Sequence, residues 1–311
     1  MSRINKVQNI LVLGVGELGI EVLRALTRHP SHGTTSISAF IRATPILSTS
    51  PKKVEELDEL RQLGVRFVLG NITNDSEEEL ASIFRDFDLV ISCMGFVSGG
   101  GIQLKITRAV LSAEVPKYIP WQFGIDYDVI GRGSAQPLFD EQLDVRDMLR
   151  GQTRTKWVII STGMFTSFLF EPTVGIINTQ QATARALGSW ANRVTITAPE
   201  DIGKLTAEVV LGDDREELFA NKPIYVAGDT ITYQRAAEIA EKVMGRSFRR
   251  TVLTVEDAMA AIAKDPDNSL NRYNVVFGEG RGVAWDLSET WNYKAGIRAA
   301  TAEEWAMVNL L

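Results

Sequence analysis

The stretch Ile10-Leu11-Val12-Leu13-Gly14-Val15-Gly16-Glu17-Leu18-Gly19 decides the fold of this 311-residue chain. Its apolar start predicts a buried strand, which runs into a Gly-x-Gly-x-x-Gly turn and then into a segment with helical spacing. In such a turn Gly14 permits the tight bend, Gly16 lets the backbone approach a pyrophosphate, and Gly19 lets the helix pack on the strand. The stretch therefore predicts a dinucleotide-binding turn. The alternative is a glycine-rich turn without a ligand.

Strand-like and helix-like segments alternate along the first part of the chain. Apolar runs predict strands at 10–13, 36–41, 65–69, 89–93, 117–119 and 157–161. Helical spacing and capping signals predict helices at 18–27, 54–63, 77–84, 102–113 and 139–150. Strands separated by helices of this length imply βαβ units with right-handed crossovers. The expected fold class is therefore α/β, a doubly wound parallel sheet of the Rossmann type.

The pattern loosens after Gly163. Helices are expected at 199–211, 233–244 and 254–264, a short strand at 223–227, and a flexible loop at 277–282. We expect a Rossmann domain over residues 1–163 and a smaller C-terminal substrate lobe over residues 164–311. The lobe is expected to be partly interleaved with the first domain, because some of its segments can return to the Rossmann core.

Composition argues against several classes of protein and site. The net charge of −6 disfavours a nucleic-acid partner, and no apolar run approaches the ~18 residues of a membrane helix. Cys93 is the single cysteine, and His29 and His32 are the two histidines, so we expect no intrachain disulfide and no metal site. The polar segment 1–9 lacks the apolar core of a signal peptide, and we expect a cytoplasmic protein.

The segment after the second predicted strand indicates which dinucleotide binds. An NAD-binding chain usually places Asp or Glu there to bond the ribose 2′-hydroxyl, but no acidic residue lies between Glu21 and Glu55. Arg42 stands at this place and can pair with a 2′-phosphate, with Lys53 or Lys52 as a second cation. A solvated basic face is the alternative. We expect NADPH or NADP+ as the cofactor.

Further residues are expected around the same cofactor. Glu17 and Leu18 open the first helix, whose N-terminal amides and partial positive charge favour phosphate. The fourth predicted strand ends at Cys93, Met94 and Gly95, where the backbone of such a fold passes the ribose and pyrophosphate. We expect Cys93 to be a small buried residue rather than a nucleophile.

Several motifs spread over most of the chain occur together in one family. They are Ile41-Arg42, Gly64-Val65-Arg66-Phe67-Val68-Leu69-Gly70-Asn71, Asp88-Leu89-Val90-Ile91-Ser92, Lys117-Tyr118-Ile119-Pro120-Trp121-Gln122-Phe123-Gly124 and Ala198-Pro199-Glu200-Asp201-Ile202-Gly203. With the glycine turn, they resemble the NmrA-like and isoflavone-reductase-like group of atypical short-chain dehydrogenases. The version at 120–124 is similar to fungal members associated with secondary metabolism. The resemblance implies a Rossmann fold, NADPH binding and reductase activity.

Two features depart from the pattern of that family. The family commonly spaces its glycines as Gly-x-x-Gly-x-x-Gly, which is one residue longer than the spacing from Gly14 to Gly19. Its reductases also carry a catalytic lysine early in the helix after the fifth strand, and matching 139–146 to that helix puts Gln142 at the lysine position. Gln142 thus takes a catalytic place but cannot donate a proton as lysine does.

The end of the fifth predicted strand faces the nicotinamide in this kind of fold. Trp121 is expected at the substrate, Gln122 could orient a substrate carbonyl or the cofactor carboxamide, and Phe123 could pack on the nicotinamide ring. Core packing is the alternative for Gln122 and Phe123. In the next loop Asp126, beside Tyr127, can donate or accept a proton if burial shifts its pKa; the alternative is a solvated turn.

Aromatic residues after the sixth predicted strand could form the wall of a substrate pocket. Met164, Phe165 and Phe168 would suit a flat, apolar small molecule, and an interface with the second lobe is the alternative. Trp285 and Trp291 could close over such a pocket as a lid.

Three functions fit these expectations. The first is an NADPH-dependent reductase of an apolar, aromatic or alkaloid-like small metabolite in secondary metabolism. It would act on an activated C=N or conjugated C=C, because such an electrophile relaxes the need for the lysine. The second is a cyclase of the same kind of pathway, assisted by NADP(H). The third is a dinucleotide-sensing regulator like NmrA, without turnover. The sequence leaves the oligomeric state open.

Overall fold

The computed structural model describes residues 9–42, 50–95 and 99–311, so the segment 1–9 lies outside the described residues except for Asn9. Two compact units divide the chain. The first comprises Met1–Gln122, Asp144–Ile160 and Ile202–Pro223, and the second comprises Phe123–Leu143, Ser161–Asp201 and Ile224–Leu311. Each unit is therefore assembled from three separate segments of the chain.

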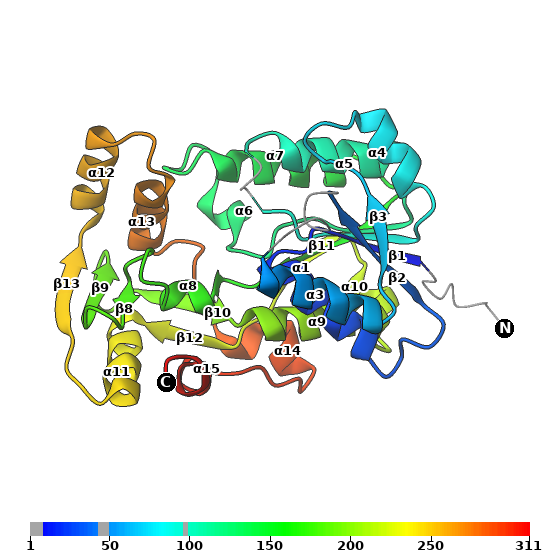
Figure 1. Cartoon of the computed structure of the whole chain (residues 1–311). Coiled ribbons are helices and arrows are strands. Elements are labelled where there is room, and N and C mark those ends of the chain that lie inside the picture. Colours follow the sequence, from blue (N-terminus) through cyan, green and yellow to red (C-terminus); the bar gives the residue numbers. More distant parts are fainter. Residues whose placement is uncertain (1–8, 43–49, 96–98) are drawn as a thin grey trace. The chain divides into compact units, whose positions relative to one another are not determined.

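The described residues of the first unit carry a seven-stranded sheet with the order β11-β6-β5-β4-β1-β2-β3 (Figure 1). Its strands are β1 (Asn9–Leu13), β2 (Ser36–Ile41), β3 (Arg66–Leu69), β4 (Leu89–Ser92), β5 (Lys117–Ile119), β6 (Lys156–Ser161) and β11 (Lys222–Tyr225). The last residues of β6 and β11, which are Ser161, Ile224 and Tyr225, are counted with the second unit. Neighbouring strands from β6 to β3 run parallel. The chain proceeds from β1 to β3 on one side and from β4 to β6 on the other, so the order reverses between β1 and β4. This confirms the predicted doubly wound fold.

Helices cover both faces of this sheet (Figure 1). One face carries α1 (Glu17–Arg28), α3 (Pro51–Gln62) and α9 (Pro199–Leu211), and the other carries α4 (Glu77–Phe84), α5 (Ile102–Ser112) and, from residue 144, α7 (Leu138–Arg150). A short helix, α10 (Arg215–Leu218), follows α9. Under α4, α5 and α7 lies one apolar core that includes Leu11, Phe84 and Trp157. Burial of these side chains is the main force that holds the helices on the sheet.

Local sequence signals explain several boundaries in the first unit. Ser76 caps α4 in the predicted capping box, because Glu79 N donates to its hydroxyl and its own N donates to the Glu79 carboxylate. The close contact between α1 and α9, in contrast, is not indicated by any local sequence motif. A Cβ on Gly203 of α9 would lie 2.4 Å from the carbonyl oxygen of Glu21, so only glycine lets these two helices approach so closely.

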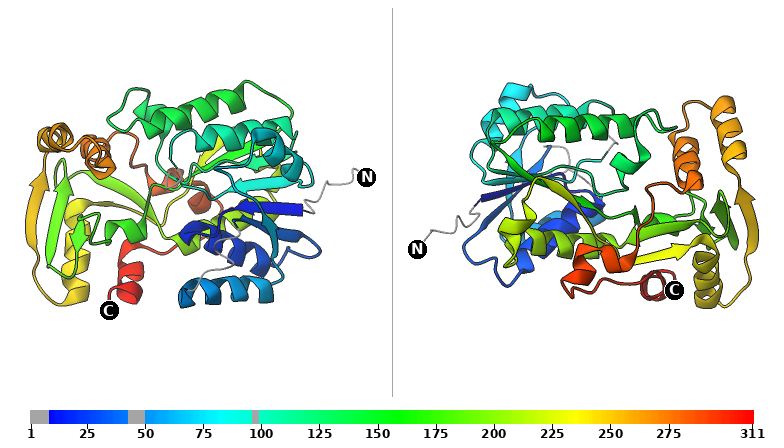
Figure 2. Two further views of the ribbon diagram at one scale, coloured as in Figure 1. Left: turned by 45° about the horizontal axis from the view of Figure 1, so that its top comes forward. Right: turned by 180° about the vertical axis from the view of Figure 1, so that it is seen from behind.

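The described residues of the second unit carry two small sheets. In one, β10 (Arg193–Thr197) lies between β7 (Met164–Phe165) and β12 (Asp229–Thr232); in the other, β9 (Thr183–Leu187) lies between β8 (Ile177–Asn178) and β13 (Arg249–Leu253). The helical segments are α6 (Tyr127–Ile130), α8 (Thr166–Leu169), α11 (Tyr233–Met244), α12 (Val255–Lys264), α13 (Ser269–Glu279), η2 (Leu287–Glu289), α14 (Trp291–Lys294) and α15 (Ala302–Asn309). The yellow helix α11 and the orange helix α13 pack on β9 (Figure 2).

The predicted flexible loop at 277–282 is wrong over its first half. The helix α13 continues through Glu279, because Asn268 caps its start and Phe277 is buried near its end. Gly280 ends the helix in the left-handed conformation, with φ of 73°. The glycines that suggested a loop therefore serve as a helix end and as small packing residues.

Among the described helices, none has the length and apolar character needed to cross a lipid bilayer. Over the same residues, no group of three or more His, Cys, Asp or Glu side chains is placed to hold a metal ion.

Candidate nucleotide-binding site

A cavity of about 360 Å³ lies at the carboxyl ends of β1 to β4, wholly within the first unit. It is formed by the loops that follow these four strands, together with one side chain of α3. The lining residues are Gly14, Val15, Gly16, Phe40, Ile41, Arg42, Lys53, Asn71, Ile72, Thr73, Cys93, Met94 and Gly95. This edge of a doubly wound sheet is where its ligands bind.

The three glycines of the turn differ in the space around them. Gly14 has φ of 94°, which other residues rarely adopt, and a Cβ there would lie 2.9 Å from Met94 Sδ. A Cβ on Gly19 would lie 2.2 Å from the Gly14 carbonyl oxygen, so Gly19 is needed for α1 to pack on the turn. A Cβ on Gly16 would have no neighbour within 4 Å. The backbone at Gly16 is therefore open to a ligand, whereas that at Gly19 is closed by the fold.

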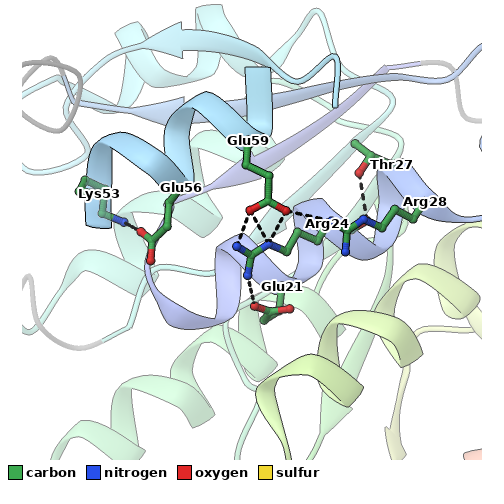
Figure 3. Close-up of polar contacts among 7 residues, drawn as sticks. All are labelled: Glu21, Arg24, Thr27, Arg28, Lys53, Glu56 and Glu59. Atoms are coloured by element: carbon green, nitrogen blue, oxygen red, sulfur yellow. Dashed lines mark hydrogen bonds and ion pairs between the residues drawn. The ribbon is translucent and has the colours of Figure 1, made fainter. Parts of the chain in front are cut away.

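The charge of the cavity is positive. Arg42 and Lys53 line it, and none of its described lining residues is Asp or Glu. The exposed Arg42 has no hydrogen bond or ion pair within the described residues. Lys53 Nζ donates to the Val15 carbonyl oxygen at 2.8 Å and contacts the carboxylate of Glu56 at 2.6 Å (Figure 3). This combination fits a phosphate group and disfavours a ligand held by a carboxylate.

Two other basic residues of the same sequence interval are occupied elsewhere. Arg24 on α1 donates to both carboxylate oxygens of Glu59 on α3 and also contacts Glu21, while Arg28 lies 2.9 Å from Glu59 (Figure 3). The hydrogen bond to Glu59 raises the pKa of Arg24, and its counterpart lowers the pKa of Glu59. These charges join α1 to α3 and leave Arg42 and Lys53 as the lining cations.

The end of β4 closes the cavity from the other side. Gln103 of α5 donates to the Met94 carbonyl oxygen at 2.7 Å and so fixes this backbone. Cys93 is buried, which raises the pKa of its thiol and disfavours a nucleophilic role. A Cβ on Gly95 would lie 3.3 Å from the indole ring of Trp121, so Trp121 packs beside a residue that lines the cavity.

Sequence reasoning did not identify the loop after β3 as part of the site. Asn71 shapes this loop, because its side-chain oxygen accepts from Thr73 N at 3.0 Å and from Asn74 N at 3.3 Å. A Cβ on Gly70 would lie 2.3 Å from the ring of Phe40, which brings the loop against the end of β2. In the structure β3 pairs with β2 in parallel, with Leu69 opposite Ile41, so the residues that follow the two strands meet. A prediction of this pairing from the sequence would have placed Asn71 near Arg42. Of the predicted cofactor residues, Glu17, Leu18, Gly19 and Phe123 are not among those that line the cavity.

Gln122, after β5, is fully buried. Its side-chain oxygen accepts a hydrogen bond from Arg146 Nε on α7 at 2.7 Å, and Arg146 is also fully buried. The Gln122 side chain is therefore joined to α7 within the first unit. Gln142 and Phe123 are buried too. Contacts of these three residues with a substrate or cofactor stay predictions.

Asp126 accepts hydrogen bonds from backbone and side-chain groups of the second unit. Its carboxylate accepts from the backbone N atoms of Asp128 and Val129, which caps α6, and it accepts the Tyr225 hydroxyl at 2.7 Å. Tyr127 is buried, with its ring 5.1 Å from that of Phe139. The sequence did not indicate Tyr225, because the residues that meet here are 99 positions apart.

Trp285 makes two hydrogen bonds and one ring contact within the second unit. Its indole Nε1 donates to the Val226 carbonyl oxygen at 3.2 Å, and its backbone N donates to Thr195 Oγ1 at 3.0 Å. Its ring lies edge-on to Tyr225 at 5.2 Å. These contacts lie within the second unit, and closure of Trp285 or Trp291 over a pocket stays a prediction.

The predicted pocket-wall residues occupy β7 and α8 of the second unit. Met164 is buried, and the rings of Phe165 and Phe168 lie 5.4 Å apart. Phe168 is 46% exposed, which is unusual for a large apolar side chain next to a partner ring. Phe170 from the same run stacks on Trp305 at 5.5 Å and belongs to the core.

Comparisons with known proteins cover nearly the whole chain. The model of the NmrA-like family matches residues 6–305. An "NmrA-like family domain-containing oxidoreductase" of Gibberella moniliformis is 42% identical over 305 residues, covering 97% of this chain and 99% of the relative. A solved isoflavone reductase has a TM-score of 0.78 at 20% identity and covers 98% of this chain and 100% of its own. The structure titled "AtPrR2 with NADP+ and (+)pinoresinol" has a TM-score of 0.76 at 20% identity, covering 98% and 99% of the two chains.

Proposed function

The chain belongs to the NmrA-like family, and from this premise we propose that it is an NADPH-dependent reductase of an apolar, aromatic small molecule. One observation carries the proposal: the cavity at the glycine turn has two lining cations, Arg42 and Lys53, and no carboxylate among its described lining residues. A relative that is 42% identical is named an oxidoreductase, and a chain of the same fold holds NADP+. These findings support the same cofactor and reaction class here.

The first unit supplies what NADP(H) requires of a protein. The open backbone at Gly16 and the N-terminal amides of α1 would receive the pyrophosphate. Arg42 and Lys53 would hold the 2′-phosphate, which an acidic residue at this place would repel. When bound, the cofactor supplies a hydride at its nicotinamide C4.

Gln142, which takes the place of the family's catalytic lysine, favours a substrate that is already activated for hydride addition. Gln142 is fully buried and has no acidic proton of useful strength, so we assign no proton transfer to it. A positively charged C=N or a conjugated C=C already delocalises the electrons that arrive with hydride, so it needs less help from an acid. The hydroxyl of Tyr225, which is hydrogen-bonded to Asp126, is our candidate for the proton-bearing group in the second unit. The half-exposed Phe168 supplies an apolar ring suited to an aromatic substrate.

Isotope transfer tests this function directly. The purified chain is incubated with NADPH deuterated at C4 and with a panel of iminium, enone and polycyclic alkaloid substrates, and products are read by mass spectrometry. Deuterium in a product supports the reductase. A cyclised product without deuterium supports the NADP(H)-assisted cyclase instead. Tight cofactor binding without turnover of any substrate supports a dinucleotide-sensing regulator. The absence of a lysine at position 142 also favours this alternative.

A further inference from the structure

Lys53 has a negative partner at the cavity, whereas Arg42 has none among the described residues. Its ammonium group bridges the Val15 carbonyl oxygen in the glycine turn, at 2.8 Å, and the Glu56 carboxylate one turn later on α3, at 2.6 Å. Figure 3 shows Glu56 and Lys53 meeting at the start of α3, apart from the Arg24–Glu59 cluster farther along that helix. Lys53 thereby connects α3 to the phosphate-binding turn.

The pair is sheltered enough for its charges to matter. The side chains of Lys53 and Glu56 expose 27% and 16% of their surfaces, and charges in such partly buried places are screened less than those in open solvent. Glu56 does not line the cavity itself, but it lies in contact with a cation that does. An anion that enters the cavity and approaches Lys53 therefore also approaches Glu56.

We propose that Glu56 is a specificity-determining residue that competes with the 2′-phosphate of the cofactor for Lys53 and so limits the affinity for NADP(H). This inference rests on the proposed function, because it assumes that NADP(H) occupies the cavity. An ammonium group has three donors, so Lys53 can keep the Val15 oxygen and reach a phosphate, but its single positive charge is then shared between two anions. Arg42 has no such competitor among the described residues that line the cavity, so we expect it to contribute the larger share of the attraction.

The consequence is that Glu56 favours rapid exchange of the cofactor over the highest possible affinity. A carboxylate near the phosphate raises the free energy of the bound state of NADPH and NADP+ alike, which speeds the release of the spent cofactor. The unphosphorylated NADH does not approach Lys53 with a 2′-phosphate and is affected much less. Glu56 therefore narrows the preference for NADPH over NADH that Arg42 and Lys53 create.

Glu56→Gln tests the inference by titration of the full chain with NADPH, NADP+ and NADH. We expect Glu56→Gln to bind NADPH and NADP+ about five- to tenfold more tightly, while NADH changes by less than about twofold. Glu55→Gln is the matched control, because it removes the same charge from an exposed position on the same helix and should leave all three affinities within about twofold. In a Lys53→Met background, Glu56→Gln should lose most of its effect.

The outcomes separate the inference from the proposed function. If the unmodified chain binds NADPH and Glu56→Gln leaves that affinity unchanged or weaker, Glu56 is not a competitor and the inference is overturned alone. Equal tightening of NADPH and NADH by Glu56→Gln and Glu55→Gln would show a general charge effect and would also overturn it. If the unmodified chain binds no NADPH, the proposed function fails first. Thermal melting of each variant verifies that a changed affinity does not reflect partial unfolding.

Discussion

The guanidinium group of Arg24 on α1 lies against the carboxylate of Glu59 on α3, with Nε at 3.0 Å from one oxygen and Nη2 at 2.5 Å from the other. The two-point contact joins the helix that begins at the glycine turn to the helix that carries Lys53. It explains why a sequence interval rich in basic residues does not present all of them to the cavity. Arg24 and Arg28, which could otherwise bind a phosphate, instead pair with Glu59 and join α1 to α3.

We predict that Glu59→Gln destabilises the chain without affecting its cofactor site. The carboxylate is 31% exposed and paired with Arg24 and Arg28, so its loss should lower the free energy of unfolding by about 1 kcal/mol. Urea denaturation measures this change. Asp58→Asn is the control, because its pair with Arg61 is more exposed and should contribute less than about 0.5 kcal/mol. A change in NADPH affinity above about threefold in Glu59→Gln would contradict the separation of the two charge clusters.

The same carboxylate predicts a pH dependence of stability. The hydrogen bond from Arg24 lowers the pKa of Glu59 in the folded chain below its ordinary value of about 4.3. The contribution of Glu59 is therefore fully present above that ordinary value and is lost as pH falls through the lower pKa of the folded chain. The difference in unfolding free energy between the unmodified chain and Glu59→Gln should be constant from pH 8 to pH 6 and should shrink below about pH 4. If this difference in unfolding free energy instead increased as the pH fell, the lowered pKa of Glu59 would be contradicted.

Two alanine substitutions in the glycine turn should separate folding from binding. Gly19→Ala places a Cβ against the Gly14 carbonyl oxygen and should destabilise the chain by about 3 kcal/mol. Gly16→Ala meets open space at an ordinary φ of −79°, so its stability should change by less than about 1 kcal/mol. Its methyl group would nevertheless stand in the way of the pyrophosphate and weaken NADPH at least about tenfold. Denaturation and titration of both variants give the comparison, and a Gly16→Ala chain with unchanged affinity would place the pyrophosphate elsewhere.

The buried pair of Gln122 and Arg146 should behave as one unit. Replacing either residue by an apolar one of similar size leaves the other without this partner, so Gln122→Leu and Arg146→Met should each cost about 2–4 kcal/mol. The double variant should be more stable than the sum of the single effects predicts, by about 1–2 kcal/mol. Strict additivity in a denaturation cycle would mean that the hydrogen bond contributes little.

Much of the first unit could be predicted because its signals are local. The apolar runs of β1 and β4 have no competing period, and the Ser76–Glu79 capping box and the glycine turn depend on neighbours within a few residues. The place of Arg42 also follows from local order, because it comes directly after β2. The parts of the cavity contributed by the glycine turn, by Arg42 and Lys53 and by the end of β4 were therefore accessible from the sequence, whereas the loop after β3 was not.

The rest depends on contacts between residues far apart in the chain. Nothing near Arg24 indicates that Glu59 will neutralise it, and nothing near Asp126 indicates Tyr225. In the second unit, strands such as β7 and β8 have two residues each, which is too short for a period to appear. In α13 the glycines suggested a loop, but burial of Phe277 outweighed their weak helix propensity.

The most direct measurement is the affinity of the purified chain for NADPH and for NADH, before and after Arg42→Ala. Arg42 lines the cavity with no competing carboxylate among the described residues, so its loss should weaken NADPH by about 10- to 100-fold and NADH by less than about threefold. That result would place the 2′-phosphate at Arg42, as the account requires. Equal weakening of both cofactors, or no binding of NADPH by the unmodified chain, would contradict it.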